Sequence, residues 1–130
     1  MILVDSSVWI DFFNGIESNS VELLEKVLKN DEVVIGDLIL TEVLQGFRFD
    51  RDMNKAQRFF SVLRYFDMLG KDISIQSALN YRKLRKKGIT IRRTIDVMIA
   101  TFCIERDISL LHNDQDFIQI GKVLPLSIIS

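Results

Sequence analysis

The sequence predicts an α/β protein: a three-layer α/β/α sandwich with a mostly parallel central sheet. Two observations lead to this prediction. Short, continuous apolar runs such as Ile2-Leu3-Val4 and Val33-Val34-Ile35 recur along the chain, and such runs are typical of buried parallel strands. Segments with helical periodicity lie between them. Strands that alternate with helices indicate a parallel sheet covered on both faces.

Four or five apolar runs are expected to form the strands. They are residues 2–4, 33–35, a weaker run at 65–69, 108–111 and 124–129. Three helices are expected between the first three runs. The first is marked by one apolar face made of Val21, Leu24, Val27 and Leu28. The second covers residues 38–47, with Asp37 as its N-cap. The third carries the apolar positions Met53, Ala56, Phe59, Phe60 and Leu63.

Two further helices are expected before the last strands. The stretch 73–87 predicts a helix that ends at Gly88, because glycine readily adopts the left-handed conformation found after helices. Thr94 is expected to cap the next helix, which runs to about Arg106. Cys103 lies in an apolar part of that helix and is expected to be a core residue.

The composition indicates one soluble globular domain over residues 1–130. The chain is 48% hydrophobic and 27% charged, which argues against disorder. A single cysteine suits a reducing compartment, and neither a signal peptide nor a transmembrane run is visible, so we expect a cytoplasmic protein. The net charge of −1 means that binding to a nucleic acid would need a local basic face or bound cations.

Acidic residues follow several of the expected strands. Asp5 ends the first strand, and Asp114 and Asp116 follow the fourth. Asp96 lies in the first turn of its helix, and Glu42 lies about one turn into another. Ligands bind beyond the carboxyl ends of parallel strands, and helical side chains lean back toward the N-terminus. We therefore expect these carboxylates to converge.

A converging group of carboxylates predicts a metal site. Two unit charges about 5 Å apart repel by about 3 kcal/mol at an effective dielectric constant of 20, and a shared cation removes this cost. Oxygen ligands select Mg²⁺ or Mn²⁺, and the chain offers no His/Cys set for zinc. Such a cation activates water and neutralises a phosphodiester. Each acid alone also has a simpler explanation, as a turn former, a helix cap or a solvated residue.

Four segments resemble the motifs of the PIN-domain family, and within it of the VapC-type toxins of toxin–antitoxin pairs. They are MILVDSSVWI (residues 1–10), TEVLQG (41–46), TIDVMIA (94–100) and LHNDQDF (111–117). Their order, their spacing and the chain length all agree with that group. Gln115 departs from the pattern, since these toxins often have a basic residue there.

The resemblance implies a PIN-like fold and a Mg²⁺- or Mn²⁺-dependent endoribonuclease. It assigns metal binding to four acids, makes Asp116 an accessory acid, and matches Ser6 to a hydroxyl position beside the site. The four metal-binding acids are Asp5, Glu42, Asp96 and Asp114. It also implies RNA as the substrate, a cognate antitoxin protein as the partner, and a homodimer.

Other conspicuous residues are given more ordinary roles. His112 is the only histidine and is expected to pack or to donate or accept a hydrogen bond. Trp9 and Phe12-Phe13 are expected in the core or at an interface rather than as base-stacking platforms. A basic stretch is either a contact for RNA phosphates or merely a solvated helix end. The residues proposed as phosphate contacts are Arg82, Lys86, Arg92 and Arg93.

Three alternatives remain open. A phosphoryl-accepting receiver domain would need an acidic pair after the first strand, but Ser6-Ser7 follow Asp5. A binding or scaffold module with a vestigial site would keep the fold without turnover. A PIN-fold nuclease of RNA processing or decay would cut RNA without a toxin role.

Overall fold

The computed structural model describes residues 1–129, which form five strands and seven helices. The strands are β1 (Ile2–Val4), β2 (Val33–Gly36), β3 (Arg64–Phe66), β4 (Ser109–Leu111) and β5 (Ile128–Ile129). The helices are α1 (Ser6–Phe13), α2 (Asn19–Asn30), α3 (Asp37–Gln45), α4 (Asp50–Phe60), α5 (Lys71–Lys86), α6 (Thr94–Arg106) and α7 (Gln115–Gly121). Strands and helices alternate, as the sequence predicts.

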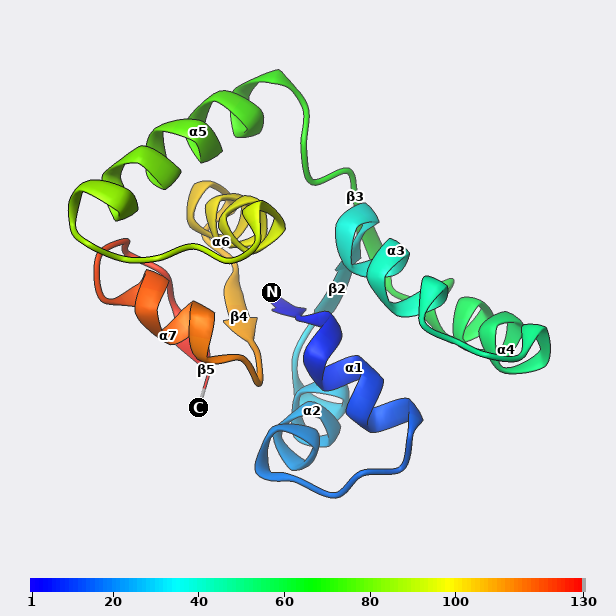
Figure 1. Cartoon of the computed structure of the whole chain (residues 1–130). Helices are drawn as coiled ribbons and strands as arrows, with labels where there is room; N and C mark the ends of the chain where they lie inside the picture. Colours follow the sequence, from blue (N-terminus) through cyan, green and yellow to red (C-terminus); the bar gives the residue numbers. More distant parts are fainter. Residues whose placement is uncertain (130) are drawn as a thin grey trace.

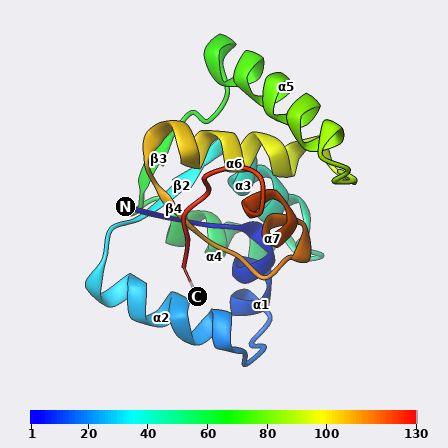
Figure 2. The same ribbon diagram turned by 90° about the vertical axis from the view of Figure 1, so that its left-hand side faces the viewer.

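The strands form a single parallel sheet in the order β3-β2-β1-β4-β5. The central strand β1 is buried on both faces, and its Ile2 is in register with Val33 of β2 and with Ser109 of β4. Helices α5 and α6 lie on one side of the sheet, and α1 and α2 lie on the other (Figures 1 and 2). The predicted three-layer sandwich is therefore confirmed.

The two edge strands differ from the sequence prediction. The third apolar run was expected at residues 65–69, but β3 begins at Arg64, and both Arg64 and Tyr65 are exposed. Met68, which follows β3, takes the fully buried position instead. The fifth run shortens to Ile128–Ile129. An edge strand pairs on one side only, so its residues need not be continuously apolar.

The structure contains two helices, α1 and α7, that the sequence prediction missed. Helix α1 buries Val8 and Trp9, and α7 buries Phe117 and Ile120. Trp9 is fully buried and its ring contacts the rings of four phenylalanines, so its predicted core role is confirmed; they are Phe12, Phe13, Phe59 and Phe60. The spacing of Trp9 from Phe12 and Phe13 is the helical signal that could have revealed α1.

Two predicted helix caps are wrong, and one helix stop is confirmed. Helix α3 has Gly36 at its N-cap, and the Asp37 carboxylate instead accepts hydrogen bonds from Leu38 N at 2.9 Å and Met68 N at 3.0 Å. Helix α6 has Arg93 rather than Thr94 at its N-cap. Gly88 follows α5 with a φ of +81°, the left-handed conformation that glycine adopts without strain.

Candidate active site

The acidic residues gather where the strand order of the sheet reverses, between β1 and β4. The chain builds outward from β1 to β2 and β3 on one side, and then places β4 and β5 on the other side of β1. The end of β1 is tied to β4 by a hydrogen bond from Asp5 N to Leu111 O at 2.8 Å. In open parallel sheets, ligands bind at this kind of reversal, beyond the carboxyl ends of the strands.

Asp5 joins the strand to the helix that follows. Its Oδ2 accepts hydrogen bonds from Ser7 N at 3.1 Å and from Ser7 Oγ at 2.6 Å, which caps α1. The side chain is buried, and Oδ1 has no hydrogen-bond partner among residues 1–129. A buried, unpartnered carboxylate oxygen is costly unless a ligand completes it.

Glu42 reaches the same edge from α3. Its Oε1 accepts a hydrogen bond from the Ser6 hydroxyl at 3.2 Å, and its Oε2 pairs with Arg93 Nη1 at 3.3 Å. Ser6 itself is buried. The hydroxyl that the resemblance places beside the site therefore holds one of the site's carboxylates.

Asp96 lies in the first turn of α6 and is buried. Arg93, at the N-cap of the same helix, holds both of its oxygens: Nη2 donates to Oδ1 at 2.8 Å, and Nε donates to Oδ2 at 3.2 Å. This paired geometry is the strong form of an arginine–carboxylate contact.

Asp114 lies in the loop after β4, and Asp116 lies in the first turn of α7. Asp114 caps α7, since its Oδ1 accepts from Asp116 N at 2.9 Å. Asp116 pairs with Arg92, whose Nη2 lies 3.1 Å from its Oδ2. His112 Nδ1 accepts a hydrogen bond from Asp114 N at 3.1 Å, and its ring lies against Phe117. The predicted packing and hydrogen-bonding role of His112 is confirmed.

These residues border a pocket of about 350 Å³. Its lining comprises Asp5, Ser6, Ser7, Ile10, Arg92, Arg93, Asp114 and Asp116. Asp96 and Glu42 join the group through their bonds to Arg93. The sequence-predicted acids are thus brought together, with Arg92 and Arg93 among them. Arg82 and Lys86 are elsewhere, on the exposed surface of α5.

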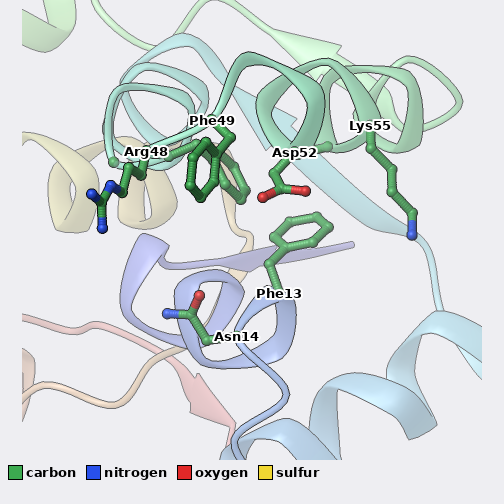
Figure 3. Close-up of a pocket in the computed structure, with 9 residues that line it drawn as sticks. Phe13, Asn14, Arg48, Phe49, Asp52 and Lys55 are labelled. Atoms are coloured by element: carbon green, nitrogen blue, oxygen red, sulfur yellow. The ribbon is translucent and has the colours of Figure 1, made fainter.

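A larger pocket of about 420 Å³ lies away from these acids. It is formed where the end of α1 meets the loop between α3 and α4, with Phe13 and Asn14 facing Phe49 and Asp52 (Figure 3). Asp52 is its only lining carboxylate within residues 1–129. One half-exposed acid cannot hold a multivalent cation, so only the smaller pocket has the ligands for one.

Burial sets the protonation behaviour of the acids. Burial raises the pKa of Asp5, against the lowering effect of its bonds to Ser7. Burial and the nearby Asp5 charge raise the pKa of Glu42. Burial also raises the pKa of Asp96, although the Arg93 guanidinium opposes this. All three carboxylates therefore resist ionisation more than free side chains do.

The residues fit a divalent cation. Carboxylate oxygens from Asp96, Asp114 and Asp116 lie within 4.8 Å of one another. The unpartnered Oδ1 of Asp5 adds a further oxygen that lacks a hydrogen bond within the described chain. An all-oxygen donor set is the chemistry of Mg²⁺ and Mn²⁺ sites.

The raised pKa values predict that the metal-depleted protein gains stability as the pH falls. A carboxyl whose pKa is higher in the folded state binds protons there first, so its contribution is lost as pH rises through that pKa and is full below the unfolded value. Urea unfolding in metal-depleted buffer should show this as the pH falls from neutral toward the ordinary pKa range of free carboxyl groups, with about 1.4 kcal/mol for each unit by which a pKa is raised.

The Asp5→Asn variant supplies the comparison, because it removes one carboxyl group whose pKa is raised and keeps His112. Burial lowers the pKa of His112, which acts in the opposite direction by making the fold less stable as this ring protonates. The pH dependence of wild type minus that of Asp5→Asn gives the contribution of the Asp5 carboxyl together with the effect of its charge on the pKa values of Glu42, Asp96 and His112. An identical pH dependence in the two proteins would show that Asp5 does not titrate abnormally.

Comparison with known proteins identifies the family. The PIN domain model matches residues 2–123, and the chain belongs to this family. It is similar to VapC ribonuclease Mb1587 of Mycobacterium bovis and to ribonuclease VapC11 of Mycobacterium tuberculosis. Each is 26% identical over 133 residues and matches 100% of this chain and 98% of the relative. The sequence resemblance to VapC-type ribonucleases is therefore confirmed.

Solved structures show the same fold. VapBC2 from Rickettsia felis, bound to a DNA fragment from its promoter, matches with a TM-score of 0.79 at 20% identity, over 99% of this chain and 98% of that one. VapC20 of Mycobacterium tuberculosis, described as a sarcin-ricin loop cleaving toxin, matches with a TM-score of 0.68 at 17% identity, over 93% and 95%. None of the helices in residues 1–129 is both long and apolar enough to span a membrane.

Proposed function

We propose that this protein is a metal-dependent endoribonuclease and the toxin of a type II toxin–antitoxin pair. The observation that carries the proposal is the convergence of four carboxylates, just after β1, on α3, on α6 and in the loop after β4, in a chain of the PIN family. The toxin role is supported by the two mycobacterial relatives named VapC ribonucleases, which match over their nearly full length.

Each side chain of the site has a distinct role in this proposal. Asp5, Glu42, Asp96 and Asp114 would hold Mg²⁺ or Mn²⁺, and the bound ion would supply activated water and charge neutralisation at the phosphodiester. Ser6 orients Glu42 through its 3.2 Å hydrogen bond. Asp116 holds Arg92 at the mouth of the pocket, where a guanidinium suits an RNA phosphate.

RNA would approach a weakly acidic protein through local positive charge. Arg92 is 69% exposed and borders the pocket, which supports it as a phosphate contact. Arg82 and Lys86 on α5 remain predicted contacts farther along the surface. Phosphate contacts of this kind position an RNA chain without reading its sequence.

A free nuclease harms its host, so we include a protein inhibitor and a homodimer in the proposal. VapBC assemblies are among the structures that share the fold. The inhibitor would offer a basic side chain to the acids and apolar side chains to the aromatic pocket of Phe13, Phe47 and Phe49.

Half-exposed Ile75 and Leu79, one turn apart on α5, offer apolar surface to a second copy. The cytoplasm is the proposed location, as the single cysteine suggests.

Expression of the wild-type chain alone should arrest growth of a bacterial host, whereas Glu42→Gln should not. The substitution keeps the volume and removes one carboxylate of the site. Glu22→Gln, on the exposed first turn of α2, is the matched control and should remain toxic. Growth curves at matched protein levels decide the matter. Equal growth with all three proteins would contradict the toxin role and would favour a PIN nuclease of RNA processing.

A further inference from the structure

Arg93 makes contacts that the sequence analysis did not anticipate. Its guanidinium touches three of the four carboxylates proposed to bind metal. It donates to both oxygens of Asp96 at 2.8 and 3.2 Å, pairs with Glu42 Oε2 at 3.3 Å and lies 3.7 Å from Asp114 Oδ2. One cation of the chain thus occupies the centre of the acidic group.

The neighbouring arginine behaves differently. Arg92 is 69% exposed, pairs with Asp116 and lies 4.0 Å from Asp114 Oδ1. Arg93 is 47% exposed, and its pairing with Asp96 and the charges of Glu42 and Asp5 raise its pKa, so it stays charged. Both arginines lie near Asp114, but only Arg93 contacts the proposed ligands Glu42 and Asp96, whereas Arg92 is held by Asp116.

A guanidinium and a divalent cation are competitors for such oxygens. Both are attracted by the same negative charge, and they repel each other at short distance. An oxygen that accepts a charge-assisted hydrogen bond is a poorer ligand until that bond is released. Asp5 Oδ1 is the exception, because this buried oxygen has no hydrogen-bond partner within the described residues.

We propose that Arg93 is an internal counter-cation of the acidic site, which competes with the divalent cation for Glu42, Asp96 and Asp114. Binding of the cation then requires the guanidinium to swing away. The side chain can do so without disturbing the core, because it stands at the N-cap of α6 and is about half exposed to solvent. This inference rests on the proposed function, since it takes the acidic group to be the metal site.

As a consequence, Arg93 lowers the affinity of the site for a divalent cation. Arg93 offsets the mutual repulsion of the acids when no cation is bound, and its displacement is a cost of loading. Removing its charge should therefore raise metal affinity and, at the same time, lower the stability of the metal-depleted fold. A residue with only a structural role would not move these two quantities in opposite directions.

Mn²⁺ titration followed by electron paramagnetic resonance tests the proposal on the full chain. Arg93→Gln should bind Mn²⁺ about tenfold more tightly than wild type, which is about 1.4 kcal/mol. Arg92→Gln is the matched control, one residue away with the same charge change, and should bind less than about threefold more tightly. Arg64→Gln, an exposed partner of Glu32 beside β2, should equal wild type. Arg93→Lys keeps the charge and should lie between wild type and Arg93→Gln.

Thermal unfolding in chelator is the second measurement, and Arg93→Gln should melt below wild type there. If wild type binds Mn²⁺ and both Arg93 variants bind it no more tightly, the competition is refuted while the metal-dependent function stands. If neither wild type nor any variant binds Mn²⁺, the metal site and the inference fail together. A folded Arg93→Lys keeps the test decisive should Arg93→Gln not fold.

Discussion

Asp96→Asn is expected to slow metal-dependent RNA cleavage by about a thousandfold, which corresponds to about 4 kcal/mol of transition-state stabilisation. Asp96 is a buried carboxylate at the start of α6, and its oxygens lie in the same cluster as those of Asp114 and Asp116. A catalytic cation stabilises developing charge by several kcal/mol. A neutral amide at this position removes one unit of the negative charge that would hold the cation.

The measurement is single-turnover cleavage of a structured RNA such as tRNA in Mg²⁺ or Mn²⁺. Asp72→Asn, in the exposed first turn of α5, is the control and should cut at the wild-type rate. Excess chelator should stop wild type. Cutting by Asp96→Asn at the wild-type rate, or full activity in chelator, would contradict a metal-dependent role for this carboxylate. Either result would mean that any RNA cleavage by this protein does not depend on a metal held by Asp96.

The sequence was sufficient to predict which acids would converge. Asp5 and Asp114 follow strands whose apolar runs are unmistakable, and the parallel order brings the ends of β1 and β4 side by side. Asp96 sits in the first turn of α6 and Glu42 about one turn into α3, and both helices begin near this edge. Strand polarity and helix direction are properties of the backbone, and periodicity reveals them.

The contacts of Arg93 could not be predicted from the sequence. It stands in a basic stretch with Arg92, which is typical of a solvated helix end, and nothing in the pattern separates one arginine from the other. The choice depends on helix α6 beginning at Thr94, which leaves Arg93 as the N-cap residue beside Asp96. With Thr94 as the predicted cap, one residue later, Arg93 would lie outside the helix and its contact with Asp96 would not be expected. Side-chain partners of this kind follow from tertiary packing rather than from local propensity.

The two short helices α1 and α7 also could not be predicted from the sequence. Helix α1 has eight residues and α7 has seven, so each shows little more than one repeat of helical periodicity. Their caps, Asp5 and Asp114, were predicted as acids of the site, and a role as a helix cap was only the simpler alternative explanation for such an acid. The two roles coincide in the structure, because the side chain that starts each helix also borders the acidic pocket.

The fold excludes one of the three alternatives. A receiver domain has the strand order 2-1-3-4-5, whereas this sheet has the order β3-β2-β1-β4-β5, so that alternative is wrong. A binding module with a vestigial site has no need for a buried Asp5 whose Oδ1 lacks a partner within residues 1–129. Such an arrangement costs stability, and proteins keep that kind of cost where function requires it.

Because the buried, unpartnered Asp5 carboxylate destabilises the metal-free fold, we expect metal to reverse the order of stability of wild type and Asp5→Asn. Asp5→Asn removes a buried charge at nearly constant volume, and asparagine still caps α1 well. In metal-depleted buffer the variant should be more stable than wild type by about 1 kcal/mol. At a Mn²⁺ concentration about 100 times the dissociation constant, wild type should gain about 2.7 kcal/mol by mass action. The variant has lost a ligand oxygen and should gain little.

Unfolding of wild type and Asp5→Asn, each with chelator and with Mn²⁺, therefore tests most directly whether the carboxylates form a site for a divalent cation. We expect Asp5→Asn to unfold at the higher urea concentration in chelator and wild type to do so in Mn²⁺. A variant that is less stable than wild type in chelator, together with no shift of either protein on adding Mn²⁺, would show that Asp5 is only the cap of α1 and that these carboxylates bind no divalent cation.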